Sequence, residues 1–81
     1  MTRKQKLYAR LKNNPGSGNF EDVHNLLIWC GFELRRVTGA HHIYKREGYD
    51  LIVTVPYHKP LKAVYVKQAI AMFEMFFDFE D

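Results

Sequence analysis

Three short segments rich in β-branched and aromatic residues follow one another with only a few turn residues between them. They are FELRRV (32–37), HHIYKR (41–46) and LIVTVP (51–56), separated by TGA and EGYD. Connections this short can join only antiparallel neighbours, because a parallel crossover needs about a dozen residues or more. The sequence therefore predicts a three-stranded antiparallel meander whose last strand ends at Pro56.

Helical patterns flank these strands on both sides. Asn19 is suited to cap a helix over 20–30, with acids in its first turn and Gly31 at its end. A second apolar stripe predicts a helix over 62–77. The order α-β-β-β-α predicts an α+β fold in which both helices cover one face of the sheet and leave the other face open to bind a partner.

The N-terminal segment differs in composition from the rest of the chain. Residues 2–12 carry good helix formers with five positive charges and no acid, and the loop-forming stretch NNPGSGN follows. We therefore predict a basic extension with a Gly/Pro loop over 1–18 and a main domain over 19–81. The extension is interpreted either as a loosely attached helix or as a frayed terminus. The other end of the chain is acidic and aromatic, with Glu74, Asp78, Phe79, Glu80 and Asp81.

Charge and cysteine content narrow the functional classes. The formal net charge of +3 favours an anionic partner only weakly. One cysteine, Cys30, allows no internal disulfide, and the charged N-terminus is unlike a signal peptide, so we expect a cytoplasmic protein. The longest apolar stretch is interrupted by Glu74 and too short to span a bilayer, so we expect no membrane association.

Strand alternation sends the two adjacent histidines of 41–46 to opposite faces of the sheet. A three-residue turn with Gly48 in the left-handed conformation would pair His41 with Val55 and Ile43 with Val53. His41 then lies at the end of the core face, which Phe32 and Leu34 join, while the outward residues are His42, Tyr44 and Arg46. A one-residue shift would exchange the faces. In any register the two histidines lie near Tyr57, His58 and Lys59.

Five short motifs occur in order within residues 20–73. They are Gly31-Phe32, Gly39-Ala40-His41-His42, Ile43-Tyr44-Lys45, Thr54-Val55-Pro56-Tyr57-His58 and Leu61-Lys62. This series resembles the HicA toxin family of type II toxin–antitoxin modules. The resemblance implies a fold similar to a double-stranded-RNA-binding domain and a small mRNA-cleaving ribonuclease neutralised by a HicB-like antitoxin. It also implies that His41 is the essential residue.

The chain departs from the family pattern at several points. Ala40 replaces the usual serine, which removes a hydroxyl that could bind a phosphate or position His41. The last helix begins AVYVKQ, so Lys67 stands roughly where an arginine is expected. These departures keep two alternatives open, a non-catalytic RNA-binding module of the same fold and a protein-interaction domain that docks through the exposed sheet and the aromatic last helix.

Cleavage of RNA without a metal or other cofactor needs two proton transfers and positive charge near the phosphate. Histidine suits the transfers because its ordinary pKa of about 6.5 lies near working pH. We therefore expect His41 to be the general acid or base. The expected RNA-binding residues are His42, Lys45, Arg46, His58 and Lys59. Together with Arg35 and Arg36, the basic strand residues form either a phosphate-binding face or merely a solvated one.

Several candidates also have an ordinary structural interpretation. His58 could be the other half of an acid–base pair or a loop histidine bonded to backbone. Tyr44 could stack on a base, although packing is commoner for a strand tyrosine. His24 and Cys30 lie along a helix stripe and are expected to be structural. A zinc site of His41, His42 and His58 is rejected, because adjacent strand histidines diverge and no further ligand completes the set.

Overall fold

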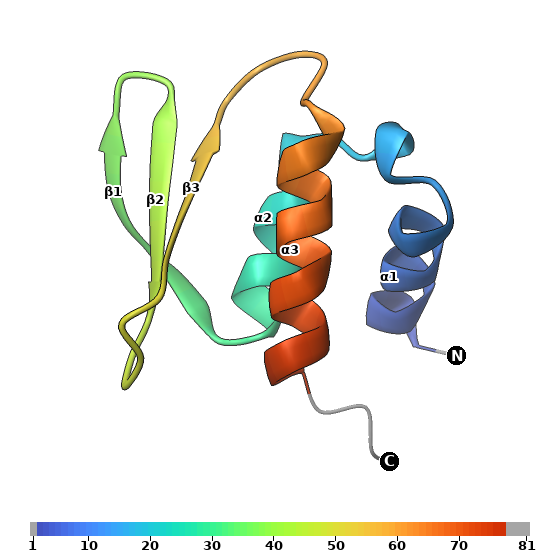
Figure 1. The fold of residues 1–81 in the computed structure, drawn as a ribbon, viewed down its shortest axis with the longest axis horizontal. Helices are drawn as coiled ribbons and strands as arrows, with labels where there is room; N and C mark the ends of the chain where they lie inside the picture. The colour runs from blue at the N-terminus through green and yellow to red at the C-terminus, as the bar shows by residue number, and fades with distance from the viewer. Residues whose placement is uncertain (1, 78–81) are drawn as a thin grey trace.

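The computed structural model describes residues 2–77, and its elements follow the predicted order. Helix α2 (Phe20–Trp29) leads into strands β1 (Phe32–Thr38), β2 (His41–Arg46) and β3 (Ile52–Pro56), and helix α3 (Ala63–Phe76) follows. Helix α1 (Arg3–Asn13) and a 3-10 turn η1 (Pro15–Ser17) precede them. The sheet is antiparallel with strand order β1-β2-β3 (Figure 1), so the α+β fold similar to a double-stranded-RNA-binding domain is confirmed. The acidic and aromatic end of the chain, residues 78–81, lies outside the described residues.

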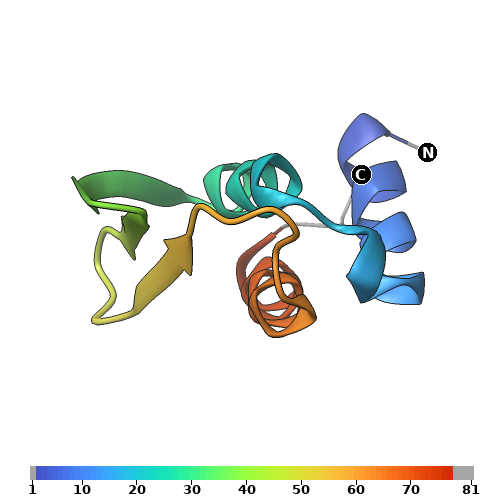
Figure 2. The ribbon, with the colours of Figure 1, turned by 90° about the horizontal axis from the view of Figure 1, so that it is seen from above.

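The molecule is arranged in three layers. Figure 2 shows α2 and α3 between the sheet on one side and α1 on the other. The core fills the space between the inner face of the sheet and these two helices, with Phe32, Tyr44, Val53 and Val55 from the strands. From the helices it receives mainly Val23, Leu26, Leu27, Val66, Ala69, Ile70 and Phe73. Within residues 2–77, no helix covers the other face of the sheet, as predicted.

The register between β2 and β3 differs by one residue from the predicted one. His42 pairs with Val55 and Tyr44 with Val53, so these residues, and not His41 and Ile43, occupy the core face. The predicted face assignment is therefore wrong. Tyr44 is fully buried, whereas His41 is exposed. The cause is the connection over 47–51, which is longer than a three-residue turn although Gly48 adopts the predicted left-handed conformation (φ 85°).

Strand β1 contains a bulge that divides its side chains between the two faces. Leu34 pairs with Tyr44 before the bulge, and Arg36 pairs with Ile43 after it. Arg36 therefore lies on the open face of the sheet. Arg35 is the extra residue, and its Nε lies 3.1 Å from a carboxylate oxygen of Glu33. Leu34 shares the face of buried Phe32 as predicted but stays 39% exposed, since it lies on an edge strand.

Helix α1 packs against the rest of the molecule, so neither a loosely attached helix nor a frayed terminus describes it. A capping box between Thr2 and Gln5 starts the helix. Leu11 is fully buried, and the ring of Tyr8 stacks on Phe73 of α3 at a centroid distance of 5.4 Å. Core packing therefore crosses the boundary between 1–18 and 19–81, and the division of the chain into these two parts remains a prediction.

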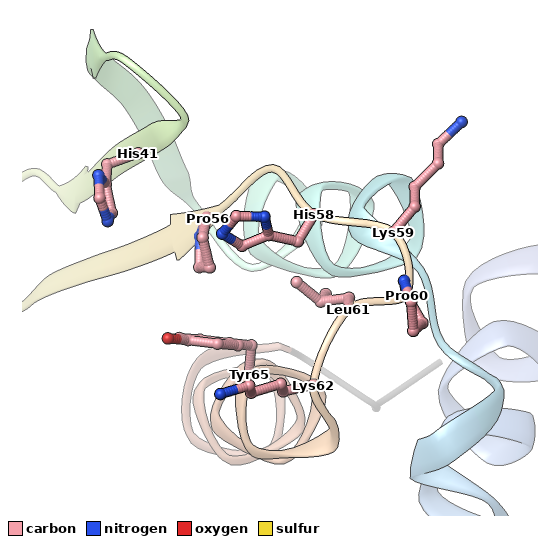
Figure 3. A pocket seen from close by; sticks show the side chains of 8 residues that line it. All are labelled: His41, Pro56, His58, Lys59, Pro60, Leu61, Lys62 and Tyr65. Carbon is pink, nitrogen blue, oxygen red and sulfur yellow. The ribbon is translucent and has the colours of Figure 1, made fainter.

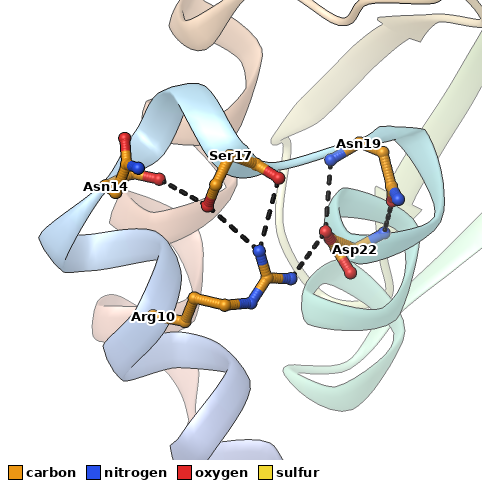
Figure 4. Close-up of polar contacts among 5 residues, drawn as sticks. All are labelled: Arg10, Asn14, Ser17, Asn19 and Asp22. Carbon is orange, nitrogen blue, oxygen red and sulfur yellow. Dashed lines mark hydrogen bonds and ion pairs between the residues drawn. The ribbon is translucent and has the colours of Figure 1, made fainter.

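Arg10 ties α1 to the start of α2 (Figure 4). Its guanidinium donates to the Oγ and the carbonyl of Ser17 at 3.0 and 3.3 Å, and to Asp22 Oδ2 at 2.8 Å. Asp22 is also the acid of a capping box with Asn19, whose side chain accepts from the Asp22 N–H at 2.8 Å. Lys12 pairs with Glu74 of α3 at 2.6 Å. Two of the five basic residues of α1 are thus neutralised within the protein.

Candidate functional site

A pocket lies where the adjoining ends of β2 and β3 meet the start of α3. Its volume is about 390 Å³. Figure 3 shows the side chains that line it, which come from the first residue of β2, the end of β3, the loop after β3 and the first turn of α3. The lining residues are His41, Pro56, His58, Lys59, Pro60, Leu61, Lys62 and Tyr65.

The backbone of the first hairpin explains why His41 lines this pocket. A two-residue connection, with Gly39 in the left-handed conformation (φ 59°), joins Thr38 to His41. The Tyr57 N–H donates to the carbonyl of Ala40 at 2.7 Å, which fixes the start of β2 against the residue after β3. His41 therefore pairs with Pro56 on the face opposite to the core, and its imidazole is exposed.

The loop after β3 brings a second histidine and two lysines to the same pocket. His58 and Lys59 follow Tyr57, and Lys62 is the residue directly before α3. The prediction that the start of the second strand lies beside His58 and Lys59 is thereby confirmed. In Figure 3 the ammonium group of Lys59 points away from His41. All three side chains are exposed, so each can reach a ligand from solvent.

His42 has a different environment from its neighbour. Its ring packs on Phe20 at a centroid distance of 4.6 Å and lies 6.0 Å from the ring of Tyr57. Its Nδ1 is 3.3 Å from the carbonyl oxygen of Ala40. The side chain is half-buried on the core side of the sheet and does not line the pocket. The structure therefore separates His42 from His41, as strand alternation predicts.

A hydrogen bond joins His24 and Tyr44 in the core next to His42. The Tyr44 hydroxyl lies 2.6 Å from His24 Nδ1. Burial, with a smaller contribution from the charge of His42, lowers the pKa of His24 below its ordinary value. Burial also raises the pKa of Tyr44 to about 12. Because Tyr44 is fully buried, it packs in the core, and no base can stack on its ring.

Lys45 and Arg46 lie at the far end of β2, roughly 13 and 16 Å along the strand from His41. Lys45 pairs with Ile52 on the open face, which it shares with His41. Arg46 is on the core side, with its guanidinium carbon 4.5 Å from the Phe76 ring centroid and 5.1 Å from that of Tyr49. Its Nε is buried without a hydrogen-bond partner. The structure therefore does not bring Arg46 to the pocket.

Gly31 makes room for this arginine. Its φ is 100°, and a Cβ at this position would lie 1.8 Å from Arg46 Nη1. The left-handed backbone conformation therefore favours glycine after α2, and any side chain there would also force the guanidinium of Arg46 to move.

Cys30 is buried at the Arg46 end of the sheet and not at the pocket. Its thiol donates to the carbonyl of Leu27 at 3.4 Å, and burial raises its pKa to about 11. It therefore has the structural role predicted for it. Within residues 2–77, no three His, Cys, Asp or Glu side chains gather as a metal ion would require, and no helix is long and apolar enough to span a membrane.

Five of the residues that line the pocket are not among the site residues predicted from the sequence, namely Pro56, Pro60, Leu61, Lys62 and Tyr65. Pro56, Leu61 and Lys62 belong to the motifs of the family pattern, which give these residues no separate role. Tyr65 belongs to the apolar pattern of α3 and gives no separate signal. Only the return of the chain from β3 to α3 brings its ring into the pocket that His41 lines, and periodicity along one helix does not encode that geometry.

Comparison with known proteins identifies a family. A family model described as the HicA toxin of bacterial toxin–antitoxin modules matches residues 20–72. The matched region contains α2, the whole sheet, the pocket and most of α3, and it leaves out α1 and η1. No curated protein and no solved structure matches the chain.

Proposed function

The chain belongs to the HicA toxin family of bacterial toxin–antitoxin modules, and we propose that this toxin is a metal-independent endoribonuclease that cleaves mRNA. The observation that carries the proposal is the exposed imidazole of His41 in a pocket that also holds His58 and Lys62. These residue types supply proton transfer and positive charge, which are what metal-free RNA cleavage requires.

The reaction uses the substrate's own 2′-hydroxyl as nucleophile. The hydroxyl oxygen bonds to the adjacent phosphorus while a base removes its proton, and the bond from phosphorus to the 5′-oxygen breaks as an acid protonates that oxygen. The products are a 2′,3′-cyclic phosphate and a 5′-hydroxyl. We assign one proton transfer to His41 and the other to His58, with Lys62 stabilising the charge on the phosphorane.

The remaining basic residues serve binding in this proposal. Lys59 at the pocket, together with Lys45 and Arg36 on the open face of the sheet, contacts phosphates of the RNA on either side of the cleaved bond. The toxin's partner is proposed to be a HicB-like antitoxin.

The test is incubation of the purified protein with RNA in EDTA. Wild-type protein should cleave, and His41→Ala should lose roughly 100-fold or more in rate, the contribution typical of a positioned acid or base. His58→Ala should remove one limb of the bell-shaped pH–rate profile. The expected end groups are a 2′,3′-cyclic phosphate and a 5′-hydroxyl. Absence of cleavage, or equal cleavage by His41→Ala purified in parallel, would contradict the enzymatic proposal.

One observation favours a second candidate, a non-catalytic RNA-binding module. Ala40 offers no hydroxyl next to His41, and its carbonyl already accepts a hydrogen bond from the Tyr57 N–H. RNA affinity without turnover, in wild-type and His41→Ala proteins alike, would select this alternative. The interaction-domain alternative receives less support, because Phe73 is fully buried and Phe76 packs on Arg46.

A further inference from the structure

The walls of the pocket at His41 are chemically divided. One part is apolar and is formed by Pro56, Pro60, Leu61 and the ring of Tyr65. The other part can carry positive charge and is formed by His41, His58, Lys59 and Lys62. A nucleotide has the same division, since its base offers a flat π face for stacking whereas its phosphate is anionic. The pocket is therefore suited to hold a base as well as a phosphate.

Tyr65 is the aromatic side chain of this apolar wall. It lies in the first turn of α3, where its N–H donates to the carbonyl of Lys62 at 3.1 Å. The ring is half-buried because it packs against the core, and its hydroxyl end reaches across the pocket toward the side of His41 (Figure 3). A tyrosine held in this way offers a rigid ring face at little cost in conformational entropy, as base-stacking platforms do.

The size of the pocket limits what can enter it. About 390 Å³ is at the lower end of the range for small-ligand sites and suits one nucleotide. A nucleotide within an A-form duplex keeps its base stacked and paired, so it presents only phosphate and 2′-hydroxyl to a protein surface. To place a base on Tyr65, the nucleotide must be unpaired or must leave its stack.

We propose that Tyr65 is the stacking platform for the base beside the cleaved phosphate, so that the toxin selects unpaired nucleotides although its fold resembles a double-stranded-RNA-binding domain. The inference rests on the proposed ribonuclease function. Tyr65 is a specificity-determining residue here, because stacking holds the ribose and phosphate of the same nucleotide at His41. Proton transfer remains with the histidines.

The first experiment compares one short RNA strand free and annealed to its complement. Wild-type protein should cleave the free strand at least about tenfold faster than the duplex. Tyr65→Ala should raise KM for the free strand by about 5- to 150-fold, the equivalent of one lost base stack, while Tyr65→Phe stays close to wild type. Tyr49→Ala is the matched control, since Tyr49 is an exposed aromatic residue at the Arg46 end of the sheet.

The second experiment measures binding without turnover, by fluorescence anisotropy of the same labelled strand. His41→Ala protein should lose the same 5- to 150-fold in affinity for the free strand when Tyr65→Ala is added, and should lose little affinity for the duplex. Equal cleavage of duplex and free strand, or an unchanged KM and Kd in Tyr65→Ala, would overturn the stacking role while leaving the ribonuclease proposal intact. If wild type cleaves nothing, the ribonuclease proposal fails, and strand-selective loss of affinity in Tyr65→Ala would still support the platform.

Discussion

The N–H of Tyr57 donates a hydrogen bond of 2.7 Å to the carbonyl of Ala40, which joins the residue after β3 to the residue before β2. His58 follows the donor and His41 follows the acceptor, and both histidines line the pocket. One backbone bond therefore holds together the two chain segments that carry the proposed acid and base. Ala40 directly precedes His41 in the chain and stands at the position where the family pattern has a serine.

The substitution Ala40→Ser tests whether the missing hydroxyl limits turnover. A serine hydroxyl beside His41 could donate to the cleaved phosphate, and one hydrogen bond to a charged group is worth about 1.4 kcal/mol or more, or about tenfold in rate. We expect a rise in single-turnover rate of up to about tenfold, with stability changed by less than about 0.5 kcal/mol. Ala40→Ser combined with His41→Ala should stay inactive. An unchanged rate would mean that the hydroxyl is dispensable.

Neighbouring basic residues of β2 should behave differently when truncated. Lys45 lies on the open face, so Lys45→Ala should weaken RNA binding and lower the slope of log affinity against log salt by about one. Arg46 stacks on Phe76 and Tyr49, so Arg46→Ala should mainly cost stability, by about 1–2 kcal/mol in urea unfolding. A loss of RNA affinity in Arg46→Ala without loss of stability would contradict this division.

Local signals in the sequence are sufficient to predict the helices and strands, but they do not predict which strand residues face the core. The Asn19 cap, Gly31 and the short hairpin turns act within a few residues, and the structure confirms the elements that they predict. The register of β2 on β3 depends on the length of the loop over 47–51. A difference of one residue in this length shifts the register by one and exchanges the faces on which His41 and His42 lie. Burial of the large Tyr44 ring favours the observed register, which a hairpin considered by itself does not specify.

The sequence predicts only those pocket residues whose proximity follows from strand pairing. That His41 and His58 meet follows from antiparallel pairing in any register. The contributions of Lys62 and Tyr65 depend on the path of the chain from Pro60 into α3, and nothing in the helical pattern distinguishes a ring facing a pocket from one facing the core.

Leu11→Ala tests whether α1 is part of the folded domain. Leu11 is fully buried between α1 and the rest of the core, so its truncation should cost about 2–5 kcal/mol in urea unfolding, with one cooperative transition. Leu34→Ala removes the same atoms from a side chain that is 39% exposed, and it should cost clearly less. Equal and small losses for both variants would mean that residues 1–18 are a dispensable extension and that 19–81 folds alone.

Burial of His24 should make the free energy of unfolding depend on pH. Because burial lowers the pKa of His24 in the folded protein, the unfolded chain binds more protons as the pH falls through about 6.5. The free energy of unfolding should therefore be highest above about pH 7 and decrease toward pH 5.5, until the lowered folded pKa is reached. The pKa of Glu74 is lowered chiefly by its hydrogen bond from Lys12. Its contribution to the free energy of unfolding is therefore lost only below about pH 4.5, outside the range in which His24 acts.

Urea unfolding at several pH values measures this effect. His24→Gln should have a lower free energy of unfolding at pH 7, although its amide oxygen can still accept from the Tyr44 hydroxyl. Its free energy of unfolding should also depend less on pH between about pH 7 and 5.5, because the titrating group is gone. His58→Gln, which replaces an exposed loop histidine, is the matched control and should keep the wild-type dependence. A dependence on pH that survives in His24→Gln would assign the effect to another group.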